Sequence, residues 1–170
     1  GMPEIQDYAR RFGINANLPP LLSMSLGAGE TNLIRLTSAY GMLVNGGKQV
    51  TPSLIDRIQD RHGKTIYRHD ERQCDGCESA IWDNQAIPDL PDTREQLTSP
   101  ASAFQMVSML EGVIQRGTGR LLSGIDLVLA GKTGTTNDNT NGWFIGFAPD
   151  MVVGVFVGYD TPRPLGKRET

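Results

Sequence analysis

Two apolar runs separated by a tight turn most constrain the fold of this chain. Trp143 to Ala148 carries large side chains at alternate positions, and Met151 to Tyr159 is apolar at almost every position. Pro149-Asp150 between them is typical of a turn, because proline presets the backbone of the first central residue. We expect two antiparallel strands, and the continuous second run predicts helices on both faces of their sheet.

A segment rich in hydroxyls and glycine precedes these strands, after a short apolar lead-in at 127–129. We expect it to form a third antiparallel strand. Thr133 and Thr135 have the same parity, so both hydroxyls can face one side and donate to a carboxylate. Lys132 supplies a positive charge that holds an anion or lowers the pKa of a neighbouring hydroxyl.

The backbone of the same segment also suits a ligand. Gly134 has no side chain, so a ligand can lie flat against the strand there, and the N–H of Thr135 can point at a developing oxyanion. Gly134 and Thr136 would shape the strand and its exit. The alternative is that Gly-Lys-Thr-Gly is simply a polar strand end, since the tripeptide alone is only moderately specific.

Three helices are expected before this sheet. The first covers Pro3 to Phe12, the second begins at a Thr31 cap and reaches Asn45, and the third opens with Ser99 as cap and Pro100 at its first position. The residues that we expect the third helix to turn toward the core are Phe104, Val107, Leu110 and Ile114. Together with the sheet, these helices predict an α+β fold with an antiparallel sheet.

The remaining segments complete a single domain over 1–170. Residues 15–29 should form a loop, where Ser23, Ser25, Glu30 and Thr31 are better explained by loop chemistry and capping than by a role in a cleft wall. Thr51 to Tyr67 predicts a hairpin turning at 60–63. The polar stretch 70–99 is expected to be an irregular insertion in which Trp82 anchors part of the segment, and 161–170 an extended exit tail.

The two cysteines lie close together, in Cys74-Asp75-Gly76-Cys77. This spacing suits half a zinc site, a redox pair or a local disulfide. Zinc needs two further ligands, and only His62 and His69 are near; both histidines are better explained as solvated residues. We therefore favour a structural disulfide or two free thiols over a metal.

Composition excludes some classes of function. The formal net charge is -3 and the basic residues are scattered, which argues against nucleic acid and against a basic membrane-binding patch. No apolar run approaches the length of a membrane span. Nothing in the sequence calls for a cofactor or a metal.

The motif and its surroundings resemble one known family. Lys-Thr-Gly-Thr-Thr, an Asn/Asp-rich loop, Trp-Phe-Ile-Gly-Phe and a Val-rich strand ending in Gly-Tyr-Asp are similar to the C-terminal half of the transpeptidase domain of class A, bifunctional penicillin-binding proteins. Segments 27–47 and 113–120 agree with it. The resemblance covers Pro3 to about Gly166.

The resemblance implies a D,D-transpeptidase as the parent protein. Such enzymes cross-link peptidoglycan stem peptides ending in D-Ala-D-Ala by serine acyl transfer, and β-lactams trap the same serine. By position, Lys132 would be the electrostatic and proton-network residue, Thr133 and Thr135 would bind the terminal carboxylate, and the Thr135 N–H would contribute to the oxyanion hole. The resemblance also places the loop at 117–119 near the cleft, although such glycines usually serve turns.

Two of the family's three motifs are missing. No serine in the chain starts a Ser-x-x-Lys sequence, and no Ser-x-Asn or Tyr-x-Asn occurs. The chain therefore resembles an excised piece that lacks its nucleophile and would be inactive alone. The family's usual acidic residue before Trp143 is replaced by Asn141-Gly142, so the loop after the motif departs from the family's pattern. Arg116 and Arg120 can reach an anionic substrate tail, but we expect them in solvent.

The family also implies a location and leaves alternatives open. The parent would be periplasmic or extracytoplasmic and anchored in the inner membrane. A piece of a serine β-lactamase or D,D-carboxypeptidase shares Lys-Thr-Gly, and a non-catalytic binding module could keep the carboxylate-binding strand. In each case, sheet surface that the parent covers would be exposed in this chain, so we expect self-association.

Overall fold

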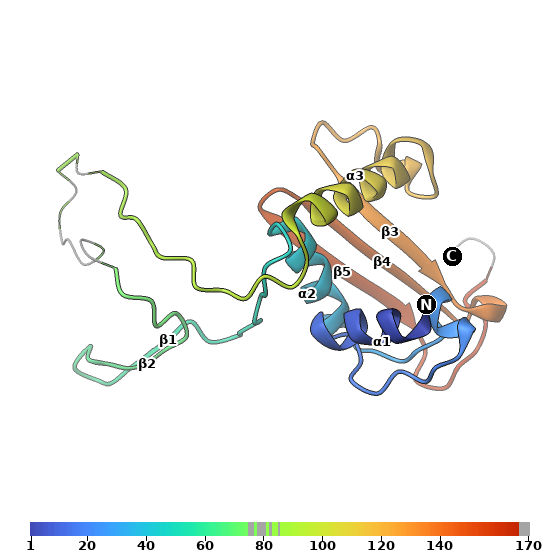
Figure 1. Cartoon of the computed structure of the whole chain (residues 1–170), viewed down its shortest axis with the longest axis horizontal. Coiled ribbons are helices and arrows are strands. Elements are labelled where there is room, and N and C mark those ends of the chain that lie inside the picture. Colours follow the sequence, from blue (N-terminus) through green and yellow to red (C-terminus); the bar gives the residue numbers. More distant parts are fainter. Residues whose placement is uncertain (75–76, 78–80, 82, 85, 167–170) are drawn as a thin grey trace. The chain divides into compact units, whose positions relative to one another are not determined.

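The computed structural model describes residues 1–74, 77, 81, 83–84 and 86–166 of the chain (Figure 1). They form two compact units. We call Gly1–Val50 with Glu95–Thr170 the sheet unit, and Thr51–Arg94 the hairpin unit. Trp82, the expected anchor of the insertion, lies outside the described residues.

The sheet unit is built on three antiparallel strands in the order β3-β4-β5. Their bounds are β3 Ala130–Thr135, β4 Asn141–Ala148 and β5 Met151–Gly158. The register runs without a break from Asn141 opposite Gly158 to Ala148 opposite Met151, so Pro149-Asp150 makes the connection, as predicted. The short apolar run 127–129 lies outside the sheet. β3 begins at Ala130, which is buried, whereas Leu127 and Val128 are exposed.

Both long helices of the sheet unit lie on one face of the sheet (Figure 1). α2 is Leu33–Val44 and α3 is Pro100–Arg116. Leu110 of α3 forms a buried cluster with Ala130 and Phe147, which are cross-strand partners. Side chains of α2 and Val152 of β5 pack against the same cluster, so one layer of apolar contacts joins both helices to all three strands.

The opposite face of β5 corrects one prediction. Helices were expected on both faces, yet Met151, Val153, Val155 and Val157 are 62%, 46%, 44% and 47% exposed. Their neighbours in sequence, Val152 and Gly154, face α2. The apolar run was interpreted correctly as a strand, but in the part of the chain that the structure describes only one of its faces is covered by a helix.

α2 approaches the sheet most closely at Gly154. A Cβ atom there would lie 3.0 Å from Leu33 Cδ1 and 3.1 Å from Ile145 Cδ1, and it would overlap the hydroxyl of Thr37. Glycine in the middle of a strand usually marks such a close approach. The close approach of α2 therefore leaves no room for a side chain at position 154 of β5.

The helix ends follow capping chemistry, with one change of residue. α1 covers Met2–Arg11 and carries its proline in the first turn. Ser99 caps α3 by accepting a hydrogen bond from the Ser102 N–H at 3.1 Å, as predicted. α2 is capped by Asn32 instead of Thr31, because Thr31 donates its hydroxyl to the Ile14 carbonyl at 2.9 Å.

α3 turns a different stripe toward the core from the one predicted. The buried residues are Ala103, Leu110, Gly112 and Ile114, while Val107 is partly buried. Phe104, which we expected in the core, is 73% exposed. The small side chain of Ala103 allows close packing at this position, which periodicity alone does not distinguish from its larger neighbour.

Short 3-10 helices fill three of the connections. η1, Leu22–Leu26, lies in the expected loop; η2, Arg120–Leu122, follows α3; and η3, Asn137–Asn139, joins β3 to β4. The segment that re-enters the sheet unit forms a bridge between Lys48 and Gln96. Leu97 is 2% exposed and packs with Phe12, Ala39 and Met42, so the end of the stretch expected to be irregular belongs to the core.

The hairpin unit has one short two-stranded sheet, β1 Arg57–Gln59 with β2 Thr65–Arg68. Asp60 organises the predicted turn, since its carboxylate accepts from the N–H groups of His62 and Lys64 at 2.8 and 2.9 Å. β1 begins only at Arg57, so Leu54 and Ile55, which we expected in the first strand of the hairpin, lie outside it. β2 covers the residues expected for the second strand, 65–67, and one more, Arg68.

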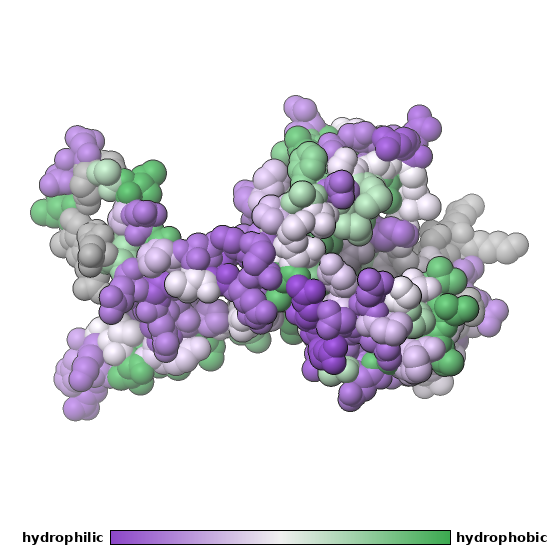
Figure 2. Space-filling model, viewed as in Figure 1, coloured by the Kyte–Doolittle hydropathy of each residue, from purple (hydrophilic) through white to green (hydrophobic). Residues whose placement is uncertain are grey.

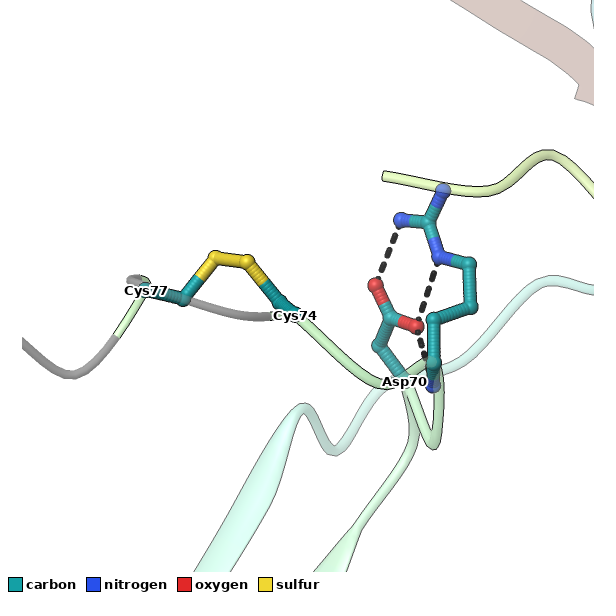
Figure 3. The surroundings of a disulfide bond; sticks show 4 residues. Asp70, Cys74 and Cys77 are labelled. Carbon is teal, nitrogen blue, oxygen red and sulfur yellow. Dashed lines mark hydrogen bonds and ion pairs between the residues drawn. A yellow bond between two sulfur atoms is a disulfide. The ribbon is translucent and has the colours of Figure 1, made fainter. Parts of the chain in front are cut away.

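Polar and covalent links follow the hairpin. Asp70 accepts two hydrogen bonds from the Arg72 guanidinium, and Cys74 and Cys77 form a disulfide (Figure 3). Every described residue from 51 to 94 is exposed or half-buried. On the face drawn in Figure 2, the surface of this unit is mainly hydrophilic, with isolated hydrophobic residues.

Candidate functional site

The Lys-Thr-Gly segment lies on β3, at the edge of the sheet (Figure 1). The Thr136 N–H, just past the strand, donates to the Asn141 carbonyl at 3.3 Å, so even-numbered residues direct their main chain at β4. Hydrogen-bonded and non-hydrogen-bonded pairs alternate along an antiparallel ladder, so Gly131, Thr133 and Thr135 occupy the pairs without mutual hydrogen bonds. The N–H of Thr135 and the N–H and C=O of Thr133 therefore point away from β4, along the outer edge.

The register separates the side chains of the motif onto two faces. Thr133 and Thr135 lie opposite Phe144 and Gly142, and both occupy the face away from α2 and α3. This agrees with the prediction that their hydroxyls share a side. Lys132 and Gly134 have the other parity and lie opposite Ile145 and Trp143.

The side chain of Lys132 lies at the strand edge. Its side chain is exposed, and its Nζ donates to the carbonyl oxygen of Thr133 at 2.6 Å. The ammonium therefore folds over the outer main chain of β3. A single positive charge at a strand edge attracts an anionic group that approaches the outward N–H groups.

A residue that the sequence did not single out completes the site. The hydroxyl of Thr118, in the loop after α3, lies 2.7 Å from the hydroxyl of Thr133. The contact links two segments that are fifteen positions apart in sequence. The resemblance placed the loop at 117–119 near the cleft, but its glycines were interpreted as turn residues and the hydroxyl of Thr118 was given no role.

Thr136 closes the loop that follows the motif. Its hydroxyl lies 2.8 Å from that of Thr140 and accepts from the Asn141 N–H at 3.1 Å. Asp138 and Asn139 adopt positive φ angles of 61° and 52°, which these residue types tolerate best after glycine. Hydroxyl and amide contacts thus order this loop, where an acidic residue is usual in the family that the sequence resembles.

The exit segment also returns to this loop. The Leu165 N–H donates to the Asn139 carbonyl at 2.8 Å, and the Arg163 guanidinium lies 3.7 Å from the centroid of the Tyr159 ring. The tail is therefore attached beside the site at least as far as Leu165, which Pro-rich composition did not predict.

The remaining candidates have local roles. Ser25 donates to the Leu22 carbonyl within η1, at 2.6 Å, and the carbonyl of Glu30 accepts from Asn15 at 2.9 Å. Ser25 and Glu30 line a hollow of about 900 Å³ formed by α1, α2 and the start of α3, which none of the residues 132–136 lines. The Arg116 guanidinium lies against Gly112 on its own helix.

The core beneath the site is apolar enough to affect one titratable group. Burial raises the pKa of the Tyr40 phenol, whose ring packs 6.3 Å from that of Phe147. Among the described residues, no group of three His, Cys, Asp or Glu side chains is arranged to hold a metal. Nor does any helix in the described segments have the length and hydropathy needed to cross a membrane.

Comparison with known proteins gives one consistent result. Residues 5–167 match the family model described as the penicillin binding protein transpeptidase domain. The whole chain is 47% identical to penicillin-binding protein 1A of Rickettsia bellii and spans 22% of that protein. It is 36% identical to penicillin-binding protein 1A of Neisseria meningitidis over 98% of the chain, which is 19% of that protein.

Solved structures share the fold. Penicillin-binding protein 1A from Haemophilus influenzae superposes with a TM-score of 0.77 at 24% identity, over 99% of this chain and 28% of that one. The PonA1 protein from Mycobacterium tuberculosis in complex with penicillin V gives a TM-score of 0.68 at 21% identity, over 94% and 42%. The chain therefore spans about a fifth of the length of the curated relatives that it matches.

Proposed function

This chain belongs to the penicillin-binding protein transpeptidase domain family, and from that premise we propose that it is the C-terminal part of a D,D-transpeptidase that cross-links peptidoglycan stem peptides. The observation that carries the proposal is the outer edge of β3, where the main chain of Thr133 and Thr135 points away from β4 beside an exposed Lys132. An edge of this kind accepts an extended peptide as an added strand.

Each residue of the motif then has a role in binding. A stem peptide ending in D-Ala-D-Ala lies along β3, and its terminal carboxylate accepts hydrogen bonds from the hydroxyls of Thr133 and Thr135. Lys132 contributes positive charge to the carboxylate and to the proton network around the nucleophile. Gly134 lets the peptide approach the strand closely.

The chemistry itself needs a serine supplied by another part of the protein. The serine oxygen attacks the penultimate D-Ala carbonyl, and the oxyanion that forms is stabilised by the Thr135 N–H. The last D-Ala leaves as the carbonyl reforms, and an amine of a neighbouring stem peptide takes the acyl group from the serine. Thr136 serves this arrangement by fixing the exit of β3, in keeping with its bonds to Thr140 and Asn141.

The partners and location follow from the same proposal. β-Lactams carry a carboxylate beside a reactive amide, so they would occupy the same strand edge. The penicillin V complex of PonA1, which has the same fold, supports β-lactam binding in general. The parent would work outside the cytoplasm, anchored in the inner membrane. The exposed apolar side chains of β5 support self-association of residues 1–170, and light scattering that gives a clean monomer at all concentrations would count against it.

The test is the intact mass of two proteins after incubation with penicillin G. Residues 1–170 alone should gain no mass, whereas the full-length protein should gain one penicilloyl group. Thr135→Val and Lys132→Ala in the full-length protein should each slow the reaction. An adduct on residues 1–170 would sink the proposal that this part lacks the nucleophile.

The same experiment separates the competing functions. A full-length protein that forms no adduct would be a non-catalytic binding module. An adduct that hydrolyses within seconds would indicate a β-lactamase. A second incubation, with a stem peptide ending in D-Ala-D-Ala, identifies a carboxypeptidase if D-Ala is released without cross-linking.

A further inference from the structure

The proposed function leaves unused the contact of Thr118 with the motif strand β3. Its hydroxyl lies 2.7 Å from that of Thr133, and either oxygen can be the donor. Thr118 is exposed and Thr133 is half-buried, so the pair lies at the surface of the site, where a ligand can reach it. The contact joins the end of α3 to the edge strand.

The loop around Thr118 is built to hold this position. The N–H groups of Gly117 and Gly119 both donate to the Val113 carbonyl at 3.1 Å, which folds the loop back over the last turn of α3. A Cβ at Gly117 would lie 2.9 Å from the Val113 backbone, and one at Gly119 would lie 2.7 Å from the Ile114 side chain. The backbone of Val113 therefore leaves no room for a side chain at position 117, and the hydroxyl of Thr118, the next residue, contacts β3.

The donor capacity of a hydroxyl decides which of the two threonines must donate if Thr133 is also to bind a carboxylate. A threonine hydroxyl has one hydrogen to donate, and a carboxylate can only accept. If Thr133 donates to Thr118, it has no hydrogen left for a bound carboxylate. If Thr118 donates to Thr133, the hydrogen of Thr133 is free for the ligand, and the two bonds in series strengthen each other.

We propose that Thr118 is a positioning residue, which donates to Thr133 and so aims the Thr133 hydroxyl at the carboxylate of the bound peptide or β-lactam. This inference rests on the proposed function, because it needs Thr133 to bind the carboxylate. Thr118 acts through Thr133 and does not touch the reacting atoms.

The test uses the full-length protein and the rate of acylation by penicillin G, resolved into a binding constant and a rate constant at saturation. Thr118→Val keeps the shape and removes the hydroxyl. We expect it to weaken binding about tenfold, because the hydrogen bond from Thr118 to Thr133 orients the bond from Thr133 to the charged carboxylate. The rate constant at saturation should change little. Thr118→Ser keeps the hydroxyl and should stay within about twofold of the original binding constant.

A double-mutant cycle shows whether Thr118 acts through its neighbour. In a Thr133→Val background, Thr118→Val should have an effect of less than about twofold, because the hydroxyl that it orients is gone. Ser123→Ala is the matched control, since it removes another exposed loop hydroxyl whose bond goes to the Arg120 carbonyl at 2.8 Å. It should leave acylation unchanged.

The outcomes are distinct. If Thr133→Val slows acylation and Thr118→Val does not, this inference is wrong and the proposed function stands. A Thr118→Val effect that persists in the Thr133→Val background would make Thr118 a direct ligand of the carboxylate and overturn the positioning role. If Thr133→Val has no effect, the carboxylate role in the proposed function itself fails.

Folding is checked separately. The thermal unfolding temperature of each variant should match that of the original protein. Thr118→Ala provides a second hydroxyl deletion in case valine disturbs the loop, and it should reproduce the loss of binding. If Thr118→Ala folds and binds penicillin G as the original does, the positioning role is refuted.

Discussion

The sheet unit and the hairpin unit are stabilised by different interactions. In the sheet unit, apolar side chains of three strands and two helices form continuous buried clusters around Phe147 and Leu97. In the hairpin unit, no described residue is buried, and the links are a short ladder, Asp-Arg pairs and a disulfide. The stability of the sheet unit, which carries the candidate site, therefore depends on apolar packing. The stability of the hairpin unit depends on local polar and covalent contacts.

The largest expected effect is the loss of a core aromatic ring from the sheet unit. Phe147→Ala should lower the free energy of unfolding by about 4 kcal/mol, because Phe147 is 5% exposed and its ring contacts both helices. Urea denaturation followed by circular dichroism measures the change. Phe104→Ala, at the position expected in the core but found 73% exposed, is the matched control and should change it by less than about 0.5 kcal/mol. Equal losses at both positions would contradict the packing described here.

The next effect is an added methyl group where α2 meets the sheet. Gly154→Ala should destabilise the sheet unit by about 1–3 kcal/mol, because its Cβ would force Thr37 and Leu33 away from β5. The same denaturation experiment measures it. The corresponding change at Gly124, where a Cβ has open space, should be close to neutral. A stable Gly154→Ala protein would mean that α2 lies farther from β5.

A smaller effect is expected from the disulfide of the hairpin unit. Replacing Cys74 and Cys77 with serine removes a link that closes a loop of only three positions, which the chain-entropy model values at about 2 kcal/mol for the local structure. Amide hydrogen exchange should speed up at residues 69–74 and 77 and stay unchanged in β4. Faster exchange in β4 would show that the two units are stabilised together.

The smallest effect is the titration of Asp70. The Arg72 guanidinium holds the pKa of this carboxyl well below its usual range, mainly through side-chain hydrogen bonds. A carboxyl whose pKa is lowered by folding contributes its full stability above the unfolded pKa and loses it as the pH falls through the folded value. Carbon-detected NMR should therefore find Asp70 still ionised in strongly acidic solution. Arg72→Gln should raise the pKa of Asp70 only part of the way to its usual range, because the N–H of residue 72 still donates to the carboxylate. Asp89→Asn, at another exposed carboxyl of the unit, should not shift the Asp70 curve.

Periodicity and turn chemistry were sufficient to predict the strands and most helix boundaries. Pro149-Asp150 and Ser99-Pro100 do what their residue types favour in any context, so the turn and the α3 cap were predicted correctly. The incorrect predictions are at positions whose structure depends on a contact with residues distant in the sequence. The hydroxyl of Thr31 donates to the Ile14 carbonyl, so Asn32 caps α2 instead. Ala103 is buried and Phe104 is exposed because the packing of α3 on the rest of the sheet unit decides which of its residues face the core.

The site was predictable to the same extent. The parity of Thr133 and Thr135 follows from alternation within one strand, so the sequence was enough to place them together. The outward direction of the Thr135 N–H depends on which neighbour β3 pairs with, and Thr118 reaches Thr133 only because α3 ends beside β3. Both facts belong to the tertiary fold, and no local pattern encodes them.

The short bridge beside Leu97 also bears on how this chain tolerates changes in its length. The Gln49 N–H donates to Glu95 and the Leu97 N–H to Gly47, each at 2.8 Å, so the chain leaves and re-enters the sheet unit at nearly one point. Insertions and deletions between these points alter a loop whose ends are already fixed, and each doubling of its length costs only about 0.6 kcal/mol. A change in the length of residues 51–94 should therefore cost the sheet unit little stability, because the positions where this segment leaves and re-enters the unit stay fixed.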